Sequence, residues 1–196
     1  RDHPLARLTT IRTGGVADYF ARPTGSNGVV ELLAWAESLN LGVGVIGSGS
    51  NLLVADTGFK GLAIKLDGHL TELHFDDATL LCGGGARLPR VAARSAEQGL
   101  AGLEFGVNIP GTVGGAIRMN ANAYGGELAS VLEWGEVASP DGIERRAPGQ
   151  FDFSYRKSNV SGYQVVTRAQ FALKPGDRDA IKANLAGMRD RRKAAQ

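Results

Sequence analysis

The sequence predicts an α+β protein built from two consecutive parts, residues 1–67 and 68–196. The first part alternates an amphipathic helix with short apolar strands, which is typical of a small sheet covered by a helix. From about Gly68 onward strand-like runs dominate, with one helix in the middle and one at the end. A chain of 196 residues that is 43% apolar can bury a substantial core.

The predicted helix of the first part runs from Ser26 to Asn40, with Ser26 as its N-cap and Gly42 as its stop. One face of this helix carries its apolar side chains at helical spacing, namely Val29, Leu32, Leu33, Ala36 and Leu39. Short apolar runs then predict a buried strand at residues 43–46 and further strands at residues 52–54 and 62–66. The first part is therefore expected to form a sheet packed on one helix.

The second part begins with a predicted hairpin over residues 70–84, followed by a helix from Leu88 to Gln98 that Gly99 closes. Two later strands are expected at residues 131–137 and 163–173. The last segment predicts a helix from Asp177 to Gln196. Its final basic residues are expected to complement the helix C-terminus, namely Arg189, Arg191, Arg192 and Lys193.

Charge and hydropathy exclude several function classes. Twenty-two Lys and Arg against 20 Asp and Glu leave a net charge of +2, so nucleic acid is not the expected partner. No apolar run approaches the ~20 residues of a membrane span, and the N-terminus lacks the apolar core of a signal peptide. We therefore expect a cytoplasmic protein without membrane contact.

Cysteine and histidine patterns argue against metal and hydrolytic chemistry. The single cysteine, Cys82, excludes an internal disulfide and is expected to be a small core residue. His3, His69 and His74 lack the spacing of metal ligands, so no metal is assigned. No G-x-S-x-G motif is present to anchor a catalytic triad.

A first glycine-rich motif, residues 47–51, lies between two predicted strands. Its backbone N–H groups and polar side chains suit a phosphate, and its members are Gly47, Ser48, Gly49, Ser50 and Asn51. Leu52 stands where a dinucleotide-binding fingerprint needs its third glycine, and no Lys-Ser/Thr pair follows for a phosphate loop. A tight connection between strands remains an equal alternative.

The second motif lies in residues 106–127, which contain six glycines and only two charged side chains. Pro110 stiffens a turn, Gly111, Gly114 and Gly115 let the backbone approach a flat ligand, and Thr112 offers a hydroxyl. Chain packing is the alternative use of these glycines. A third motif, Tyr155-Arg156, places a guanidinium that can clamp a carboxylate or stabilise developing negative charge, with a surface salt bridge as the alternative.

Four segments in this order resemble the UDP-N-acetylenolpyruvoylglucosamine reductase family, and the resemblance covers nearly the whole chain. They are TTIRTGGVADYFARP, GSGSNLLVADTGFKGLAIKL, GLEFGVNIPGTVGGAIRMNANAYGGE and FDFSYRKS. The resemblance implies the FAD-binding fold of vanillyl-alcohol-oxidase-like (PCMH-type) flavoproteins, made of two α+β subdomains with FAD between them. It also implies that NADPH reduces FAD and that the flavin then passes hydride to the enolpyruvyl group of a UDP-sugar, in peptidoglycan synthesis.

The same resemblance assigns roles to individual residues. Residues 47–51 would hold the FAD pyrophosphate, and the flavin and its phosphate chain would be lined by Ile109, Pro110, Gly111, Thr112, Gly114 and Gly115. Arg156 matches the catalytic arginine, which stabilises negative charge beside the substrate carboxylate, and Tyr155 is expected to contact the substrate.

The chain departs from the family pattern in two respects. Asn108 and Asn122 replace small residues, and Asn122 would suit a position with positive φ. The family's third domain, with a proton-donating serine and a late glutamate, is expected beyond Gln196. Ser154, Ser158 and Ser161 are outside the serine's motif and are not assigned its role.

Three functions therefore stay open from the sequence. The first is the FAD-binding portion of this reductase, with a UDP-sugar and NADPH as its small-molecule partners and a monomeric or weakly dimeric state. The second is a flavin- or nucleotide-binding module without reductase activity. The third is another oxidoreductase of the same flavoprotein superfamily.

Overall fold

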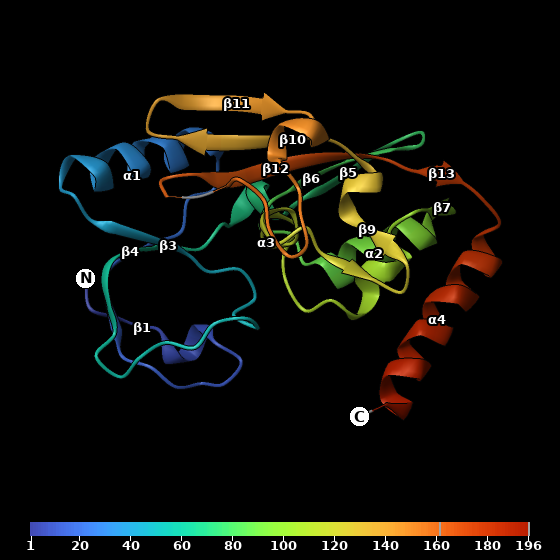
Figure 1. Ribbon diagram of the computed structural model, residues 1–196, viewed down its shortest axis with the longest axis horizontal. Coiled ribbons are helices and arrows are strands. Elements are labelled where there is room, and N and C mark those ends of the chain that lie inside the picture. The colour runs from blue at the N-terminus through green and yellow to red at the C-terminus, as the bar shows by residue number, and fades with distance from the viewer. Residues whose placement is uncertain (161, 196) are drawn as a thin grey trace.

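The computed structural model describes residues 1–160 and 162–195, which form two sheets with helices packed between and beside them. In Figure 1 the N-terminal sheet lies at one end of the molecule and the C-terminal helix α4 at the other. Within the described residues no helix combines the length and the apolar character needed to cross a membrane.

The first sheet has four strands in the order β1-β2-β4-β3. Its strands are β1 (His3–Pro4), β2 (Val16–Ala21), β3 (Gly42–Val45) and β4 (Phe59–Ile64). Both β2 and β3 run parallel to β4, whereas β1 is antiparallel to β2. Helix α1 (Ser26–Ser38) connects β2 to β3, because a connection between strands of the same direction has to cross back over the sheet.

The second sheet is fully antiparallel, with its five strands in the order β11-β10-β12-β6-β5. Its strands are β5 (Leu73–Asp76), β6 (Thr79–Gly83), β10 (Leu132–Ser139), β11 (Gly142–Arg146) and β12 (Val165–Ala172). The pairing of β10 with β12 shifts register twice, which bends the centre of the sheet.

Helix α1 packs against both sheets. Its buried Val29, Leu33 and Ala36 join Leu62 and Ile64 of β4 in one core. The same core includes residues of the second sheet, namely Ala138 and Val165. The two sheets are therefore held together through α1. The predicted boundary between residues 67 and 68 falls between β4 and β5 and stays a prediction.

The larger core lies beneath the second sheet and includes residues of α2 (Leu88–Glu97) and α3 (Val113–Arg118). Helix α4 (Arg178–Ala194) packs on α2 and on the 3-10 helix Glu104–Asn108. Two short ribbons complete the fold: β7 (Leu100–Ala101) pairs with β13 (Lys174–Pro175), and β8 (Asn122–Ala123) pairs with β9 (Gly126–Glu127).

The structure confirms the predicted helices at α1, α2 and α4 and the hairpin β5-β6. The N-cap of α1 is Gly25, however, and Ser26 is the first helical residue. Leu39, expected on the buried face, lies at the end of the helix and is 52% exposed.

The strand predicted at residues 43–46 is present as β3 but is less buried than expected, and the strand predicted at residues 52–54 was wrong. Residues 43–46 were expected to be buried, but β3 is an edge strand paired on one side only, and Val45 is 38% exposed. Residues 52–54 form no strand, and Leu53 is 77% exposed. A short apolar run does not reveal whether a neighbouring strand covers it, because that depends on chain segments far away in the sequence.

Candidate functional site

The two glycine-rich motifs lie in direct contact. The loop of residues 47–51 follows β3, and the loop of residues 109–112 leads into α3. Ser50 Oγ donates a hydrogen bond of 2.5 Å to the carbonyl oxygen of Pro110. A Cβ atom on Gly47 would lie 2.7 Å from Thr112 Oγ1. The fold thus brings together two motifs that are about 60 residues apart.

Some of these glycines serve chain packing. Gly49 has φ of +70°, and a Cβ atom there would lie 1.9 Å from the carbonyl oxygen of Leu8. A Cβ atom on Gly114 would lie 3.0 Å from the carbonyl oxygen of Val166. The packing alternative therefore holds for Gly49 and Gly114, where a side chain would press against backbone.

Other glycines face open space. A Cβ atom on Gly111 would have no atom within 4 Å, and one on Gly115 would have only Thr112 Oγ1, at 3.5 Å. Neither of these glycines has positive φ, so neither is required by backbone conformation. Bare backbone at Gly111 and Gly115 leaves room for a ligand to approach the start of α3.

The backbone of residues 47–51 presents unpaired donors. The carbonyl oxygen of Gly47 accepts a 2.6 Å hydrogen bond from Lys65 Nζ, and that of Gly49 accepts one of 3.0 Å from the Thr10 N–H. Among the described residues, the N–H groups of residues 48–51 donate to no protein acceptor. Consecutive free N–H groups in a turn form a nest that attracts an anion.

A pocket of about 320 Å³ lies beside the second motif. Its walls come from four separate segments of the chain and consist of Asn108, Ile109, Pro110, Asn122, Ala123, Tyr124, Arg156 and Arg192. Arg156, the predicted catalytic residue, therefore lines the same pocket as Ile109 and Pro110. These two residues belong to the loop of residues 109–112, which we call the flavin loop after its predicted ligand. We call the pocket the Arg156 pocket.

The turn that carries Arg156 is tied to the end of α3. Ser154 and Lys157 form an antiparallel bridge, and Arg156 between them has φ of 56°. Asn120 Nδ2 donates to the Ser154 carbonyl oxygen at 3.3 Å, and Ser158 Oγ donates to the Arg118 carbonyl oxygen at 2.8 Å. These contacts fix Arg156 relative to the flavin loop, because α3 begins directly after that loop.

Tyr155 is placed differently from Arg156. It is 82% exposed and does not line the Arg156 pocket. The guanidinium carbon of Arg156 lies 5.8 Å from the centre of the Tyr155 ring, which is a cation–π contact at the surface. A substrate contact by Tyr155 stays a prediction.

Both asparagines that depart from the family pattern line the Arg156 pocket. Asn108 Nδ2 donates to the Met188 carbonyl oxygen at 2.8 Å and to the Tyr124 hydroxyl at 3.0 Å, which ties α4 to the flavin loop. Asn122 belongs to strand β8 and does not have positive φ, whereas Asn120 and Tyr124 on either side of it do.

The sequence did not identify Tyr124 or Arg192 as pocket residues. Arg192 was expected only to complement its helix, yet its Nη1 donates to the Asn108 carbonyl oxygen at 2.5 Å. Nothing in the local pattern of α4 signals this contact, since the two residues are 84 positions apart.

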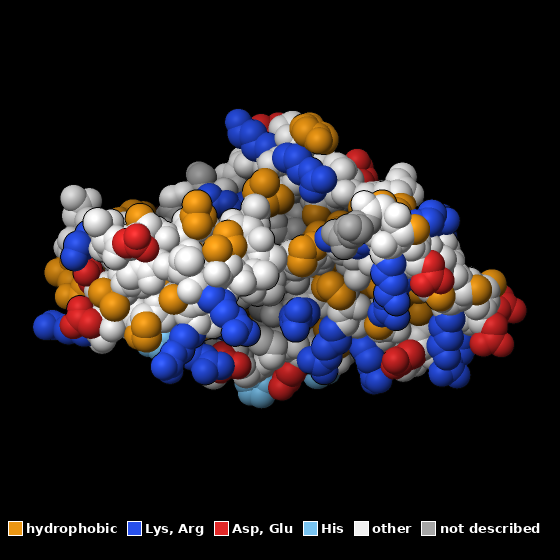
Figure 2. Space-filling model, turned by 90° about the horizontal axis from the view of Figure 1, so that it is seen from below, with side chains coloured by type: hydrophobic (Ala, Val, Ile, Leu, Met, Phe, Trp, Pro, Cys, Tyr) orange, Lys and Arg blue, Asp and Glu red, His pale blue; other side chains and the backbone are white. Residues whose placement is uncertain are grey.

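A second pocket of about 350 Å³ lies beside the first motif. Its walls are Arg7, Leu8, Thr9, Thr10, Arg12, Ser48 and Lys65. We call it the Lys65 pocket. Figure 2 shows that Lys and Arg side chains gather along the lower part of the face that it draws.

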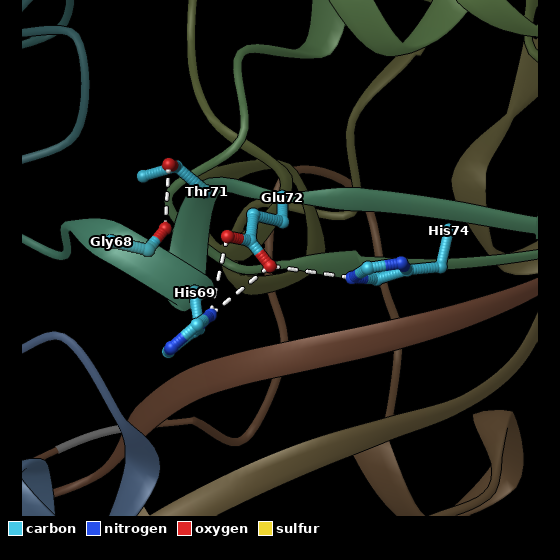
Figure 3. Close-up of polar contacts among 5 residues, drawn as sticks. All are labelled: Gly68, His69, Thr71, Glu72 and His74. Carbon is cyan, nitrogen blue, oxygen red and sulfur yellow. Dashed lines mark hydrogen bonds and ion pairs between the residues drawn. The ribbon is translucent and has the colours of Figure 1, made fainter.

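Glu72 and Cys82 lie outside both pockets, and the shifts of their pKa values have causes in their immediate surroundings. Figure 3 shows Glu72 between His69 and His74, with His69 Nδ1 at 3.2 Å and His74 Nε2 at 3.3 Å from its carboxylate. Hydrogen bonding to His69, and to a smaller extent to His74, holds the pKa of Glu72 below its usual value. Burial raises the pKa of the Cys82 thiol, which is therefore an inert core residue.

No group of three or more potential ligands is arranged to hold a metal ion within residues 1–160 and 162–195.

Comparison with known proteins first defines the class. Residues 17–147 match the model of the FAD binding domain family, so the chain contains a FAD-binding domain. A structure of alkyldihydroxyacetonephosphate synthase, 16% identical, superposes with a TM-score of 0.60 over 80% of this chain and 34% of that chain. At that identity the likeness shows only that the two share a fold, which is the PCMH-type FAD-binding fold.

Two further matches are much stronger. UDP-N-acetylenolpyruvoylglucosamine reductase 2 of Symbiobacterium thermophilum is 40% identical over 198 residues, a match to 100% of this chain and 64% of the relative. The crystal structure of UDP-N-acetylenolpyruvylglucosamine reductase from Thermus caldophilus is 32% identical, with a TM-score of 0.86 over 100% of this chain and 70% of that one. The chain belongs to the UDP-N-acetylenolpyruvoylglucosamine reductase family of flavin oxidoreductases.

The residues present fit FAD. The free N–H groups of residues 48–51 suit its pyrophosphate, and the open sides of Gly111 and Gly115 leave space beside the backbone. Ile109 and Pro110 of one loop line the Arg156 pocket, and Ser48 of the other loop lines the Lys65 pocket. The Thr112 hydroxyl adds an uncharged polar group beside Gly47, whereas the Ser50 hydroxyl is already engaged with the Pro110 carbonyl oxygen.

Proposed function

We propose that this chain is the FAD-binding portion of a reductase that uses NADPH to reduce the enolpyruvyl group of a UDP-N-acetylglucosamine derivative, a step of peptidoglycan synthesis. Bound FAD would supply the hydride chemistry. The observation that carries the proposal is the Arg156 pocket, where a cationic side chain meets Ile109 and Pro110 of the flavin loop. The named relatives support the same reaction.

The chain's own residues would divide the work as follows. Residues 47–51 would bind the pyrophosphate through free N–H groups, and Gly111 and Gly115 would let the flavin approach the backbone. Arg156 would bind the substrate carboxylate and stabilise negative charge that develops beside it, because a fixed cation in a partly enclosed pocket lowers the energy of a charged transition state. Tyr155 would contact the substrate from the rim.

The proton that completes the reduction has no proposed donor among the described residues. Ser158 is 7% exposed and its hydroxyl donates to the Arg118 carbonyl oxygen, so it serves the fold. Ser154 holds its turn through its backbone bridge to Lys157, and Ser161 lies outside the described residues. We propose that the proton donor belongs to a segment equivalent to the part of the relatives that lies outside the match. We further propose that the protein is cytoplasmic and acts as a monomer or weak dimer.

The test is steady-state kinetics with the complete product of the gene, following NADPH oxidation that depends on the enolpyruvyl substrate. Replacing Arg156 by Met should lower kcat about 100-fold or more while FAD binding stays unchanged, because the lost cation acts on the transition state. Lys157→Met is the matched control, since it removes one positive charge from the same turn at a residue that does not line the pocket. Equal kcat values for the two variants would refute the role of Arg156.

A further inference from the structure

The last two turns of α4 lack apolar anchors. The buried side chains of the helix end at Met188, and the side chains of residues 189–195 are all exposed. Arg192 Nη1 donates to the Asn108 carbonyl oxygen at 2.5 Å, and the guanidinium carbon of Arg191 lies 5.6 Å from the centre of the Tyr124 ring. Because burial of apolar area does not hold this end of the helix, its docking depends on a few polar contacts.

The side-chain amide of Asn108 reaches the same place from the other side. Its Nδ2 donates to the Met188 carbonyl oxygen at 2.8 Å and to the Tyr124 hydroxyl at 3.0 Å. The Tyr124 hydroxyl in turn donates to the Met188 carbonyl oxygen at 3.5 Å. A carbonyl oxygen can only accept a hydrogen bond, so the amide nitrogen of Asn108, and not its oxygen, has to face α4. Both N–H groups of this amide are therefore used to hold α4 and Tyr124.

Asn108 is also the residue from which the flavin loop starts. It is the last residue of a 3-10 helix, and Ile109 and Pro110 follow it directly. Further along, the loop is held by Ser50, which donates to the Pro110 carbonyl oxygen. Asn108 and Arg192 line the Arg156 pocket together with Ile109 and Pro110. The docked end of α4 is thus part of the wall that the flavin loop completes.

We propose that Asn108 is a positioning residue which, with Arg192, couples the docking of the last two turns of α4 to the flavin loop. A ligand in the Arg156 pocket contacts a wall that is complete only while α4 is docked, so it binds the docked state better than the undocked one. By linkage, the ligand and the docked helix stabilise each other by the same factor. The coupling rests on these contacts alone, and the choice of FAD as the ligand rests on the proposed function.

Hydrogen–deuterium exchange, read by NMR, tests the coupling without any ligand. Asn108→Ala should speed the exchange of the amides of residues 189–193 about fivefold, the usual effect of losing one hydrogen bond. Asn122→Ala is the matched control, because Asn122 lines the same pocket but makes no hydrogen bond to α4 in the described part of the chain. Circular dichroism checks that both variants keep the fold.

The same measurement tests the coupling in the opposite direction. Arg192→Met alters α4 and should speed exchange at the Ile109 N–H, which donates to the Gly106 carbonyl oxygen at 3.1 Å, by about the same factor. Arg189→Met is the matched control, since Arg189 is exposed on the same helix and does not line the pocket.

A second set of exchange measurements adds FAD at saturating concentration. FAD should slow exchange of the α4 amides at least about fivefold in the unaltered chain and in Asn122→Ala, but less than about twofold in Asn108→Ala, where the link between loop and helix is broken. A residue with a purely structural role would change the stability of the fold and not this response to the ligand.

The outcomes separate the coupling from the proposed function. Faster exchange in Asn108→Ala and Arg192→Met than in their controls supports the coupling. If FAD then binds to none of these proteins, the proposed function is refuted and the coupling stands. Exchange rates equal to those of the controls overturn the coupling. So does FAD that binds to the unaltered chain without slowing exchange in α4.

Discussion

Among the described residues, three of the eight non-glycine residues with positive φ line one of the two pockets. Arg12, Tyr124 and Arg156 have φ of 60°, 52° and 56°, and each contributes to one of the pocket walls. A side-chain-bearing residue in this region costs about 1–2 kcal/mol, which the surrounding contacts have to offset. For Arg156 those contacts are the hydrogen bonds that Asn120 and Ser158 make to backbone carbonyl groups.

Gly49 offers a direct test of a structural glycine in the site. Its φ of +70° and the 1.9 Å approach of a Cβ atom to the Leu8 carbonyl oxygen leave no room for alanine. Gly49→Ala should lower the free energy of unfolding by about 2 kcal/mol or more, measured by urea denaturation. Gly149→Ala is the control, since a Cβ atom there has no neighbour within 4 Å. Equal urea midpoints for the two variants would show that position 49 has room for a side chain.

At the scale of elements, α4 links the end of the described chain to the site. Its buried Ile181, Leu185 and Met188 pack on α2, and Arg192 reaches the Asn108 carbonyl oxygen. Asp177 caps the helix by accepting from the Ala180 N–H at 2.7 Å. The cap and the apolar spacing are local features, so they are consistent with the helix that the sequence predicted from Asp177 onward.

Gly187 is a weak point within α4. It lies in the interior of the helix, outside the positive-φ region, and no atom lies within 4 Å of its Cβ position. Gly187→Ala should raise the free energy of unfolding by about 0.5–1 kcal/mol, because alanine loses less backbone entropy in a helix. Thermal and urea unfolding measure the change. A decrease in stability would mean that α4 packs more tightly around residue 187 than described.

The elements that the sequence predicted are those set by local periodicity. The helices and the β5-β6 hairpin follow from apolar spacing and turn residues. The exposure of β3 depends on its place at the sheet edge, and the walls of both pockets combine segments far apart in the chain. The motifs at 47–51 and at 109–115 were visible because glycine and hydroxyl residues cluster there, whereas Arg7, Lys65 and Arg192 belong to no such cluster.

At the scale of the whole molecule, the site lies where the two sheets meet. Helix α1 is shared by both, and Ser26 at its start donates to Glu136 Oε1 of β10 at 2.5 Å. Thr167 of β12 donates to the same oxygen at 2.7 Å. This buried carboxylate fixes the first sheet against the second, and with it the loop of residues 47–51 against the flavin loop.

The central claim is that these two loops together hold FAD, and a flavin titration tests it most directly. Quenching of flavin fluorescence would be followed for the chain itself, for Gly111→Val and for Gly149→Val. Both glycines have open Cβ positions and neither has positive φ, but only Gly111 lies in the flavin loop. We predict FAD binding by the unaltered chain and by Gly149→Val with equal affinity, and binding at least about tenfold weaker by Gly111→Val. No FAD binding by the unaltered chain, or the same affinity in all three proteins, would contradict the account.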